Sequence, residues 1–419
     1  MSSPHQPPPR LRTRVTAAFA VLTAAAVAVV LYGAWVQWEA LLFWSSGTAG
    51  LSDFDVYRQA AFSVLDQQPL YEGKRFITGD GNQYDWTYTP FGALLMTPLA
   101  WLPRVVADNA WITANLAALA VITWISFRAL ISRLTNHKPL VLLAFTFAML
   151  TLAPVSEALG LGQLGILLIF GVLVDAVVLA ERRSRWTGVL VGLGTAVKLT
   201  PGVFIVYWII TRQYRAALTA TATILAAWSI AAVLLWQDSL QYFAGLRFLN
   251  LTGEIGDFTF SSWNQSLYAM IGRYTTAGYG LWLPIAAVLI AVTYTVAYRA
   301  WKHNNLLLAA ANVGMMTVLV SPISWIHHAI WVIPALGAIV GDGRRLPFTA
   351  AALTLGFLAT SPTRQQPFFN NYEIWGLSFV LLYIVTLITT LSSDDTGRQQ
   401  ETSPTHSRHT QPAAETPDT

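Results

Sequence analysis

Long apolar segments, separated by few charged residues, recur along most of this 419-residue chain. Hydrophobic residues make up 54% of the sequence and charged residues 11%, against about 45–50% and about 25% in typical globular proteins. So few charges cannot cover a water-exposed surface, and the chain is predicted to be an all-α polytopic membrane protein. This excludes a soluble enzyme, a disordered scaffold and a nucleic-acid-binding module. The absence of cysteine excludes disulfides, thiol catalysis and cysteine-ligated metals.

The orientation of the spans follows from the rule that Lys and Arg collect on the cytoplasmic side. Arg10, Arg12 and Arg14 place the N-terminus inside, and about 11–12 spans follow, some of them broken. This arrangement of the spans puts 17 of the 25 Lys and Arg residues on the cytoplasmic side. The eight others are Arg58, Lys74, Arg75, Arg104, Lys198, Arg247, Arg273 and Arg364. The expected continuous spans are 15–36, 105–127, 139–154, 162–180, 216–236, 280–300, 305–320, 329–341, 346–360 and 374–392.

Two further apolar segments do not fit a simple span. Residues 90–102 are bracketed by prolines and are shorter than the roughly 17–25 residues that a span requires, so they predict a half-helix. Residues 186–211 contain Lys198-Leu199-Thr200-Pro201, and a single span would place the arginines that follow outside. Two half-helices that fold back at this turn would keep them inside. Broken helices at membrane depth line a cavity or are buried in protein, so this turn is a candidate part of a site.

The domain organisation is simple. A Pro-rich basic tail, 1–12, and a polar tail, 393–419, are predicted to be disordered and cytoplasmic. The membrane-embedded domain is 13–392. Its long outer loops, 38–89 and 237–279, carry most of the polar residues that could take part in catalysis or binding. The working face is therefore predicted to be extracytoplasmic.

The first outer loop carries two carboxylates, Asp53 and Asp55, at the start of a helix-like stretch. Carboxylates just beyond a span can act as a general base or hold a divalent cation. They can equally be solvated loop acids or a helix N-cap. Lys198 is a second candidate, because a cation within the membrane is expensive and is usually paired or functional, although it can also snorkel to the interface.

Later in the chain an adjacent pair, His327 and His328, lies at a predicted outer helix junction. Neighbouring side chains on a helix point about 100° apart, which is poor geometry for chelating one metal ion. The pair is therefore interpreted as phosphate or hydroxyl partners, or as capping residues. No P-loop, zincin motif or Gly-x-Ser-x-Gly elbow occurs in the sequence, which disfavours ATPase, protease and lipase functions.

Six short motifs occur in a fixed order: Asp-Phe-x-Val-Tyr, Tyr-Thr-Pro-Phe-x-x-Leu-Leu, Gly-Gln-x-x-x-Leu, Lys-Leu-Thr-Pro, Asn-Gln-Ser-Leu and Ser-Pro-Ile-Ser-Trp-x-His-His. In this order they resemble glycosyltransferase family 87, the polyprenol-phosphate-mannose-dependent α-1,2-mannosyltransferases. The resemblance covers residues 50 to about 340. One departure is Tyr88-Thr89-Pro90, where the family more often has Tyr-Pro-Pro.

The resemblance implies a GT-C fold, a multi-span helical bundle whose active site faces away from the cytoplasm. The family's catalytic acid corresponds to Asp53, with Asp55 as second choice, and its histidine corresponds to His327 or His328. The implied partners are a polyprenyl-phosphate-mannose donor, a mannosylated glycolipid acceptor (phosphatidylinositol mannoside or lipomannan) and membrane lipids, without nucleic acid, metal or cofactor. The proposed donor-phosphate ligands are the histidines, Lys198 and Arg247. The proposed sugar-binding residues are Tyr57, Tyr88, Gln163, Asn264, Gln265 and Trp325.

Other functions stay open at this point. A transporter or flippase of a polyprenyl-linked sugar would use a similar polar cavity. A partner subunit of an envelope-synthesis complex would not need the outer carboxylates. Within the enzyme class, another polyprenyl-phosphate sugar, such as arabinofuranose or glucose, could replace mannose, and only the family resemblance prefers mannose.

Overall fold

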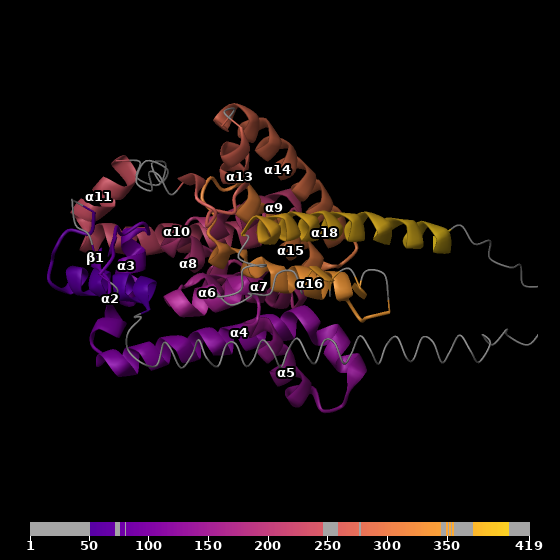
Figure 1. Ribbon diagram of the computed structural model, residues 1–419, viewed down its shortest axis with the longest axis horizontal. Coiled ribbons are helices and arrows are strands. Elements are labelled where there is room, and N and C mark those ends of the chain that lie inside the picture. Colours follow the sequence, from indigo (N-terminus) through magenta and orange to yellow (C-terminus); the bar gives the residue numbers. More distant parts are fainter. Residues whose placement is uncertain are drawn as a thin grey trace, which may run out of the picture.

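The computed structural model describes residues 51–71, 76–79, 81–245, 259–275, 278–344, 349–350, 352, 354–355 and 372–401. The predicted first span, 15–36, the N-terminal tail and Arg247 lie outside the described residues, as do residues 402–419. The described chain is a helical bundle, which confirms an all-α polytopic membrane protein (Figure 1). The only sheet among the described residues pairs two short antiparallel strands, β1 (Phe76–Ile77) and β2 (Gln83–Tyr84).

The bundle is built from helices of very different lengths. The first half contains α2 (Ser52–Leu65), α3 (Pro90–Ala100), α4 (Arg104–Leu134), α5 (Lys138–Leu150), α6 (Ala153–Leu161), α7 (Gly165–Leu173), the π-helical turn η1 (Val174–Leu179), α8 (Val189–Val197), η2 (Thr200–Gly202) and α9 (Val203–Ile210). The second half contains α10 (Tyr214–Leu234), α11 (Trp236–Ala244), α13 (Leu267–Tyr274), α14 (Gly278–Lys302), α15 (Leu306–Val320), η5 (Ile326–Trp331), α16 (Val332–Val340) and α18 (Tyr372–Glu401).

Three of the described helices are long and apolar enough to cross a membrane alone: α4, α10 and Gly280–Lys302 within α14. Their outward faces carry large apolar side chains such as Leu218, which is 68% exposed, and Val233, which is 82% exposed. Such exposure is unfavourable in water at about 25 cal/mol per Å² and is expected where lipid chains cover the surface. The exposed apolar faces therefore agree with three of the predicted spans, 105–127, 216–236 and 280–300.

One bent pair, Ala153–Leu161 and Gly165–Leu179, turns by 119°. The break contains Gly162 in the left-handed conformation, with φ of 68°. A Cβ atom on this glycine would lie 2.7 Å from the Cβ of Phe54 and 3.0 Å from that of Leu51. The bend thus brings the start of α2 directly against the backbone. The sequence predicted a span at 139–154, whereas the structure ends α5 at Leu150 and begins the separate helix α6 at Ala153.

A second break lies at Lys198, between α8 and η2. Gly188, before α8, packs against the backbone of Ala216 in the first turn of α10, and α9 also ends beside that turn, where the N–H of Gln213 donates to the carbonyl of Trp208 (2.7 Å). The two ends of the segment therefore lie at the same end of α10. Ala196, near the break, instead meets Trp228 farther along α10. The segment folds back at Lys198, as the sequence predicted.

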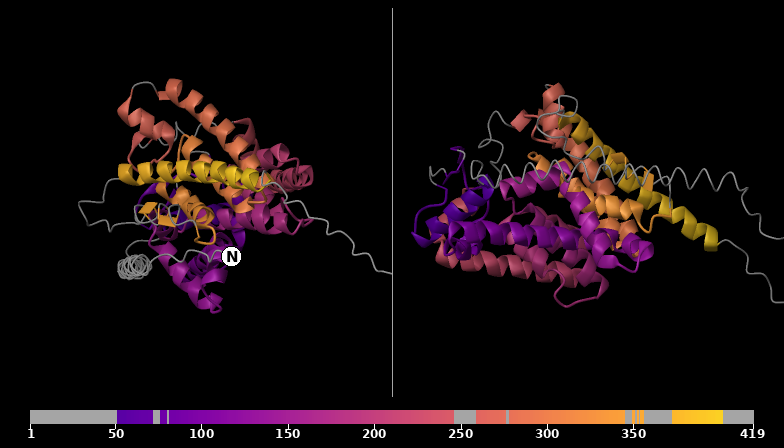
Figure 2. Two further views of the ribbon diagram at one scale, coloured as in Figure 1. Left: turned by 90° about the vertical axis from the view of Figure 1, so that its right-hand side faces the viewer. Right: turned by 60° about the horizontal axis from the view of Figure 1, so that its bottom comes forward.

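The bundle has two chemically different ends. Figures 1 and 2 show the long helices side by side, with α2, α3 and α11 gathered at one end. At the other end, Arg128 pairs with Glu181, and Arg133 donates to the carbonyl of Asp342 (2.6 Å). These are residues predicted to be cytoplasmic. Which end faces the cytoplasm stays a prediction. Helix α18 continues to Glu401, beyond the expected end of the membrane domain at 392.

We expect Gly162→Ala to destabilise the protein by about 2–5 kcal/mol, because a left-handed alanine costs about 1–2 kcal/mol and overpacking adds about 1–3 kcal/mol. Thermal unfolding of the purified protein in detergent measures the effect. Gly280→Ala is the matched control, since nothing lies within 4 Å of a Cβ built at Gly280. Equal melting temperatures for the two variants would contradict the tight contact between the bend and α2.

Candidate functional site

Five segments meet at the end of the bundle that carries α2. They are the first turns of α2, the loop before α3, the α6–α7 bend, the break after α8 and the start of η5. The side chains that they bring together form what we call the polar cluster. Its members are Asp53, Tyr57, Tyr88, Gln163, Lys198 and His328.

The carboxylate of Asp53 is held by the amide of Gln163. The Nε2 group of Gln163 donates to Oδ2 of Asp53. On the other side of the amide, Oε1 accepts from the hydroxyl of Tyr57 at 3.0 Å and faces the hydroxyl of Tyr88 at 3.4 Å. A flipped amide would turn its oxygen toward the carboxylate and its NH₂ group toward two hydroxyl donors. The network therefore fixes Gln163 as a donor to Asp53.

The two tyrosines stay protonated at ordinary pH. Burial, followed by the neighbouring Tyr88, raises the pKa of Tyr57 well above its usual value. Burial, followed by the charge of Asp53, raises the pKa of Tyr88 in the same way. Their oxygens lie 3.0 Å apart. Both phenols therefore remain neutral hydrogen-bonding groups beside the carboxylate.

Aromatic rings fix the first turns of α2. Tyr57 meets Tyr88 and Trp111 edge-on, with ring centroids 5.5 and 5.9 Å apart, and Phe54 stacks on Trp111 at 5.0 Å. The indole Nε1 of Trp111 donates to the carbonyl of Gly162 at 2.8 Å. Trp111 in α4 thus contacts both the α6–α7 bend and α2. It thereby keeps Gln163, which follows the bend, close to Asp53 in α2.

The cationic side of the cluster is formed by Lys198 and His328. Lys198 Nζ lies 5.2 Å from the ring centroid of Tyr88 and 3.2 Å from Nε2 of His328. The backbone N–H of Trp325 donates to Nδ1 of His328 at 3.3 Å. In the neutral ring the proton is then on Nε2. Both groups in the Lys198–His328 contact are donors, an arrangement that favours an acceptor oxygen beside them.

His327 lies next to this pair but outside its hydrogen bonds. Its ring stands edge-on to His328, with centroids 4.6 Å apart. Nε2 of His327 is buried and has no hydrogen-bond partner among the described residues. His328 is therefore the histidine that contacts Lys198 directly, and His327 offers a further donor or acceptor to a bound group.

Thr89 fixes the position of Lys198 by bonding to the two residues before it. Its N–H donates to the carbonyl of Val197 at 3.3 Å, and its hydroxyl donates to that of Ala196. The same hydroxyl oxygen accepts from the N–H of Gly92 at 3.2 Å and caps α3. The φ of Thr89 is −68°, a value that proline also adopts. The departure from Tyr-Pro-Pro therefore leaves the backbone shape unchanged and adds bonds that hold the end of α8.

The second carboxylate, Asp55, is not part of the polar cluster. It lies on the opposite face of α2, where it pairs with Arg104 and accepts the N–H of Gly79 at 3.1 Å. Its side chain is 5% exposed. The partner of Asp55 could not be read from the sequence, although Arg104 was already one of the eight basic residues that the predicted arrangement of the spans left outside the cytoplasm.

Asn264 and Gln265 form hydrogen bonds with backbone groups of neighbouring loops. Nδ2 of Asn264 donates to the carbonyls of Thr259 and Pro322 at 2.9 and 3.1 Å, and Oδ1 accepts the N–H of Ser324 at 2.8 Å. The N–H of Gln265 donates to the carbonyl of Ser324 at 2.7 Å. These bonds hold the loop before η5, which carries Trp325 and the histidines. A sugar contact for either residue stays a prediction.

Sequence reasoning missed Thr89, Trp111 and Arg104 as parts of this region. Each acts through a contact between distant segments, for which no local pattern exists. Among the described residues, no group of three or more His, Asp or Glu side chains could hold a metal ion. The polar cluster offers a carboxylate at one side and two N–H donors at the other, a layout suited to removing a proton and to stabilising a departing anion.

Comparison with known proteins identifies relatives over most of the chain. The model of glycosyltransferase family 87 matches residues 86–322. A polyprenol-phosphate-mannose-dependent alpha-(1-2)-phosphatidylinositol mannoside mannosyltransferase from Mycobacterium tuberculosis is 33% identical over 68% of this chain and 69% of its own length. The protein of the same name from Mycolicibacterium smegmatis is 29% identical over 88% and 90%. No solved structure matches the chain.

A phosphatidylinositol pentamannoside mannosyltransferase from Mycobacterium tuberculosis, also described as polyprenol-phosphate-mannose-dependent and alpha-(1-2)-specific, is 28% identical over 91% of this chain and 90% of its own length. The relatives thus span two acceptors of one chemical class.

We expect Thr89→Val to lower the stability of the protein by about 1–3 kcal/mol, because it removes a fully buried hydroxyl that bonds to two backbone groups. Thermal unfolding in detergent measures the loss. Thr295→Val, which removes an exposed hydroxyl bonded only within α14, is the control and should change the melting temperature little. A Thr89→Val protein as stable as the control would show that the end of α8 does not depend on Thr89.

Proposed function

Because this chain belongs to glycosyltransferase family 87, we propose that it is an inverting membrane mannosyltransferase. In this proposal it moves mannose from polyprenyl-phosphate-mannose to a hydroxyl of a mannosylated glycolipid, a phosphatidylinositol mannoside or lipomannan, and forms an α-1,2 linkage. The names of the relatives support the donor and the acceptor class. The observation that carries the proposal is the polar cluster, in which Asp53 faces the Lys198–His328 pair across Gln163 and Tyr88. Family membership does not favour the transporter alternative.

Asp53 is the proposed general base. The acceptor hydroxyl gives its proton to the carboxylate while its oxygen attacks C1 of the donor mannose. The C1–O bond to phosphate breaks on the opposite side, so a β-linked donor gives an α-linked product. A phosphate leaving group departs as a stable monoester and needs no general acid, so a single base is sufficient, unlike the two carboxyl groups of glycosidases.

The departing phosphate is assigned to Lys198 and His328. Negative charge grows on the phosphate oxygens as the C1–O bond breaks, and donors fixed in advance stabilise such charge by about 3–4 kcal/mol each. The ammonium of Lys198 and the Nε2–H of His328 are adjacent donors, 3.2 Å apart. An oxygen of the phosphate would accept from both. His327 and Arg247 are the further candidates for this group.

The remaining residues have positioning and sugar-binding roles in this proposal. Gln163 orients Asp53, and Tyr57 and Tyr88 orient Gln163. Trp325 is half-buried at the start of η5 and offers an aromatic face to a sugar ring. Asn264 and Gln265 keep this segment in place through their backbone bonds.

We further propose that the polar cluster faces away from the cytoplasm and that both termini are cytoplasmic. The separation of the two ends of the bundle supports this orientation. The polar cluster lies at the end with α2, whereas Arg128 and Arg133, at the far end of α4, lie with Asp342 and Glu181. Basic residues at span ends mark the cytoplasmic side.

We expect Asp53→Asn to reduce the rate of mannosyl transfer by about 10²–10⁴-fold, the usual contribution of a general base. The assay follows radiolabelled mannose from polyprenyl-phosphate-mannose into a phosphatidylinositol mannoside with the purified protein in detergent. Asp66→Asn, at the exposed end of α2, is the matched control and should retain full activity. Full activity in the Asp53 variant would remove the base assignment, and no transfer by wild type with several mannolipids would remove the proposed reaction.

The dependence of the transfer rate on pH in the Gln163→Glu variant tests whether Gln163 acts on Asp53. A second carboxylate in contact with Asp53 disfavours the ionised base, as in other carboxylate pairs. The base works when deprotonated, so the acid limb of the rate profile should move to higher pH. Gln68→Glu adds the same charge at an exposed position of the loop after α2 and should leave the profile in place. An unchanged acid limb in the Gln163 variant would separate Gln163 from the base.

A further inference from the structure

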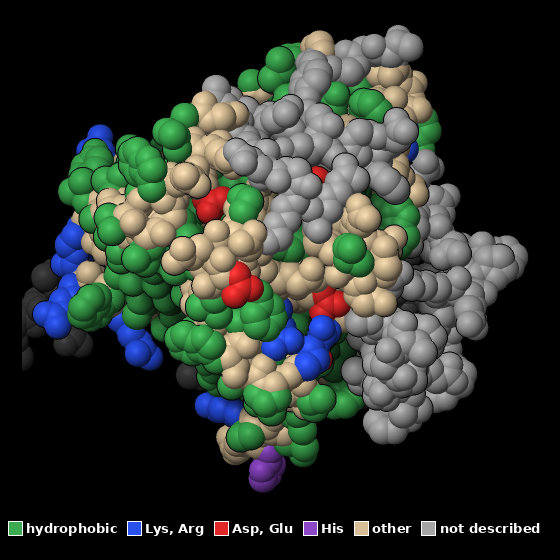
Figure 3. All heavy atoms as spheres, turned by 90° about the vertical axis from the view of Figure 1, so that its left-hand side faces the viewer, with side chains coloured by type: hydrophobic (Ala, Val, Ile, Leu, Met, Phe, Trp, Pro, Cys, Tyr) green, Lys and Arg blue, Asp and Glu red, His purple; other side chains and the backbone are tan. Residues whose placement is uncertain are grey.

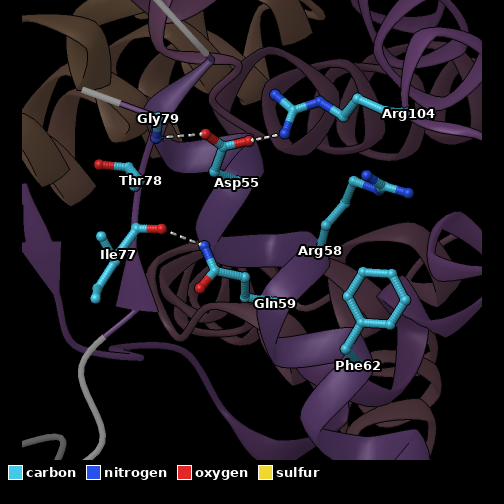
Figure 4. A pocket seen from close by; sticks show the side chains of 8 residues that line it. All are labelled: Asp55, Arg58, Gln59, Phe62, Ile77, Thr78, Gly79 and Arg104. Atoms are coloured by element: carbon cyan, nitrogen blue, oxygen red, sulfur yellow. Dashed lines mark hydrogen bonds and ion pairs between the residues drawn. The ribbon is translucent and has the colours of Figure 1, made fainter. Parts of the chain in front are cut away.

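A polar pocket lies on the face of α2 that carries Asp55, away from the polar cluster (Figure 4). It has a volume of about 310 Å³. Four of its lining residues follow one another along α2 at the spacing of a single helix face, and the others come from β1, the turn after it and the first residue of α4. The lining residues are Asp55, Arg58, Gln59, Phe62, Ile77, Thr78, Gly79 and Arg104.

Two guanidinium groups dominate this pocket. Arg104 bonds to Asp55 and, at 2.7 Å, to Asp108, while Arg58 donates to the carbonyls of Leu99 and Leu102 at 3.3 and 2.8 Å. Each guanidinium has five N–H donors, and its contacts with described residues use two, which leaves three. Figure 4 shows both arginines on the same side of α2, with Arg104 reaching toward Asp55. Two arginines and one carboxylate, Asp55, line the pocket, so its lining carries one net positive charge, and each guanidinium keeps N–H donors that these contacts do not use.

The surroundings of the pocket are apolar. Phe62 and Ile77, which line it, are 40% and 59% exposed, and Trp101 and Val105, next to Arg104, are 71% and 69% exposed. Figure 3, which looks onto this end of the molecule, shows a few acidic and basic side chains side by side within a largely hydrophobic and uncharged surface. Since Arg104 begins a span-length helix, the pocket lies where a span meets the membrane interface, a level at which tryptophan is enriched.

This combination fits the head group of a phospholipid. Guanidinium groups bind phosphate oxygens in paired hydrogen bonds. Asp55 keeps Arg104 in place through their ion pair. The acyl chains would then lie along the exposed face of α4, which begins with Val105 and Val106.

We propose that this pocket holds the phosphodiester of the acceptor lipid. The inference rests on the proposed function and names a second contact for its acceptor. Asp53 and Asp55 are two residues apart and so project about 200° apart around α2. A lipid anchored beside Asp55 would pass its glycan over the first turn of α2 to reach Asp53. The pocket would thus set which mannose of the acceptor meets the base.

The first test measures lipid binding and does not depend on transfer. The full chain in detergent is titrated with dioleoyl phosphatidylinositol, and bound lipid is counted by native mass spectrometry. Arg104→Gln and Gln59→Glu should each weaken binding on the order of tenfold, the equivalent of one charge-assisted hydrogen bond. Gln59→Glu adds a carboxylate to the lining that holds the two arginines and removes one hydrogen bond, from Nε2 of Gln59 to the carbonyl of Ile77 (2.8 Å), so thermal unfolding of both variants in detergent checks that the protein stays folded.

Three comparisons make the binding result specific. Arg128→Gln removes a surface arginine paired with Glu181 at the far end of the bundle, and Asp53→Asn removes the base. Both should bind phosphatidylinositol as wild type does. Dioleoylglycerol, which lacks phosphate, should not bind. Equal binding by wild type and both pocket variants would overturn the proposal, and so would complete competition by inorganic phosphate, which would indicate a site for the free ion.

The second test links the pocket to the acceptor. In the transfer assay, Gln59→Glu should raise the KM for a phosphatidylinositol mannoside on the order of tenfold, with kcat little changed. A KM equal to that of wild type, together with weakened phosphatidylinositol binding, would assign the pocket to a bystander lipid and overturn its acceptor role. Absence of transfer by wild type would instead remove the proposed function and leave the binding result standing.

Discussion

Backbone groups freed at a helix break must find partners inside this bundle, and the rest of the structure depends on how they do so. A helix that stops within an apolar bundle exposes carbonyls whose desolvation is expensive when they are left unpaired. Each break near the polar cluster is closed by a side chain from another segment. Trp111 bonds to the carbonyl of Gly162, Thr89 bonds to those at the end of α8, and Asn264 bonds to that of Pro322. Each of these breaks is therefore cross-linked to another segment by a side chain that bonds to its backbone.

These cross-links also explain why the chemical groups meet. Gln163, Lys198 and His328 each lie at or next to a break, where the side chain is released from regular helix packing. The segment that bonds to the end of α8 also contacts the residue that follows it. Thr89 bonds to the carbonyl of Ala196, and the neighbouring Tyr88 places its ring against Lys198. Positioning and stability thus come from the same bonds.

The sequence predicted the members of the polar cluster better than the contacts that hold them in place. Low charge and the positions of Lys and Arg indicated the fold class and the fold-back at Lys198, because both are consequences of membrane energetics along the chain. The family resemblance pointed to Asp53, Tyr88, Gln163 and Lys198. The separate helix α6, the Thr89 bonds and the Arg104–Asp55 pair were not predicted, since each depends on contacts between distant segments. Periodicity carries no information about such contacts.

The two carboxylates at the start of α2 show why residue type alone did not decide their roles. Asp55 faces a guanidinium that is charged at every accessible pH, so its negative charge is balanced and its oxygens are engaged in holding α2 to α4. Asp53 accepts a hydrogen bond from the neutral amide of Gln163, and its charge acts on Lys198 within the polar cluster. The periodicity of α2 puts these environments on opposite faces, so a helix of fixed pitch places one aspartate in the polar cluster and the other in the contact between α2 and α4.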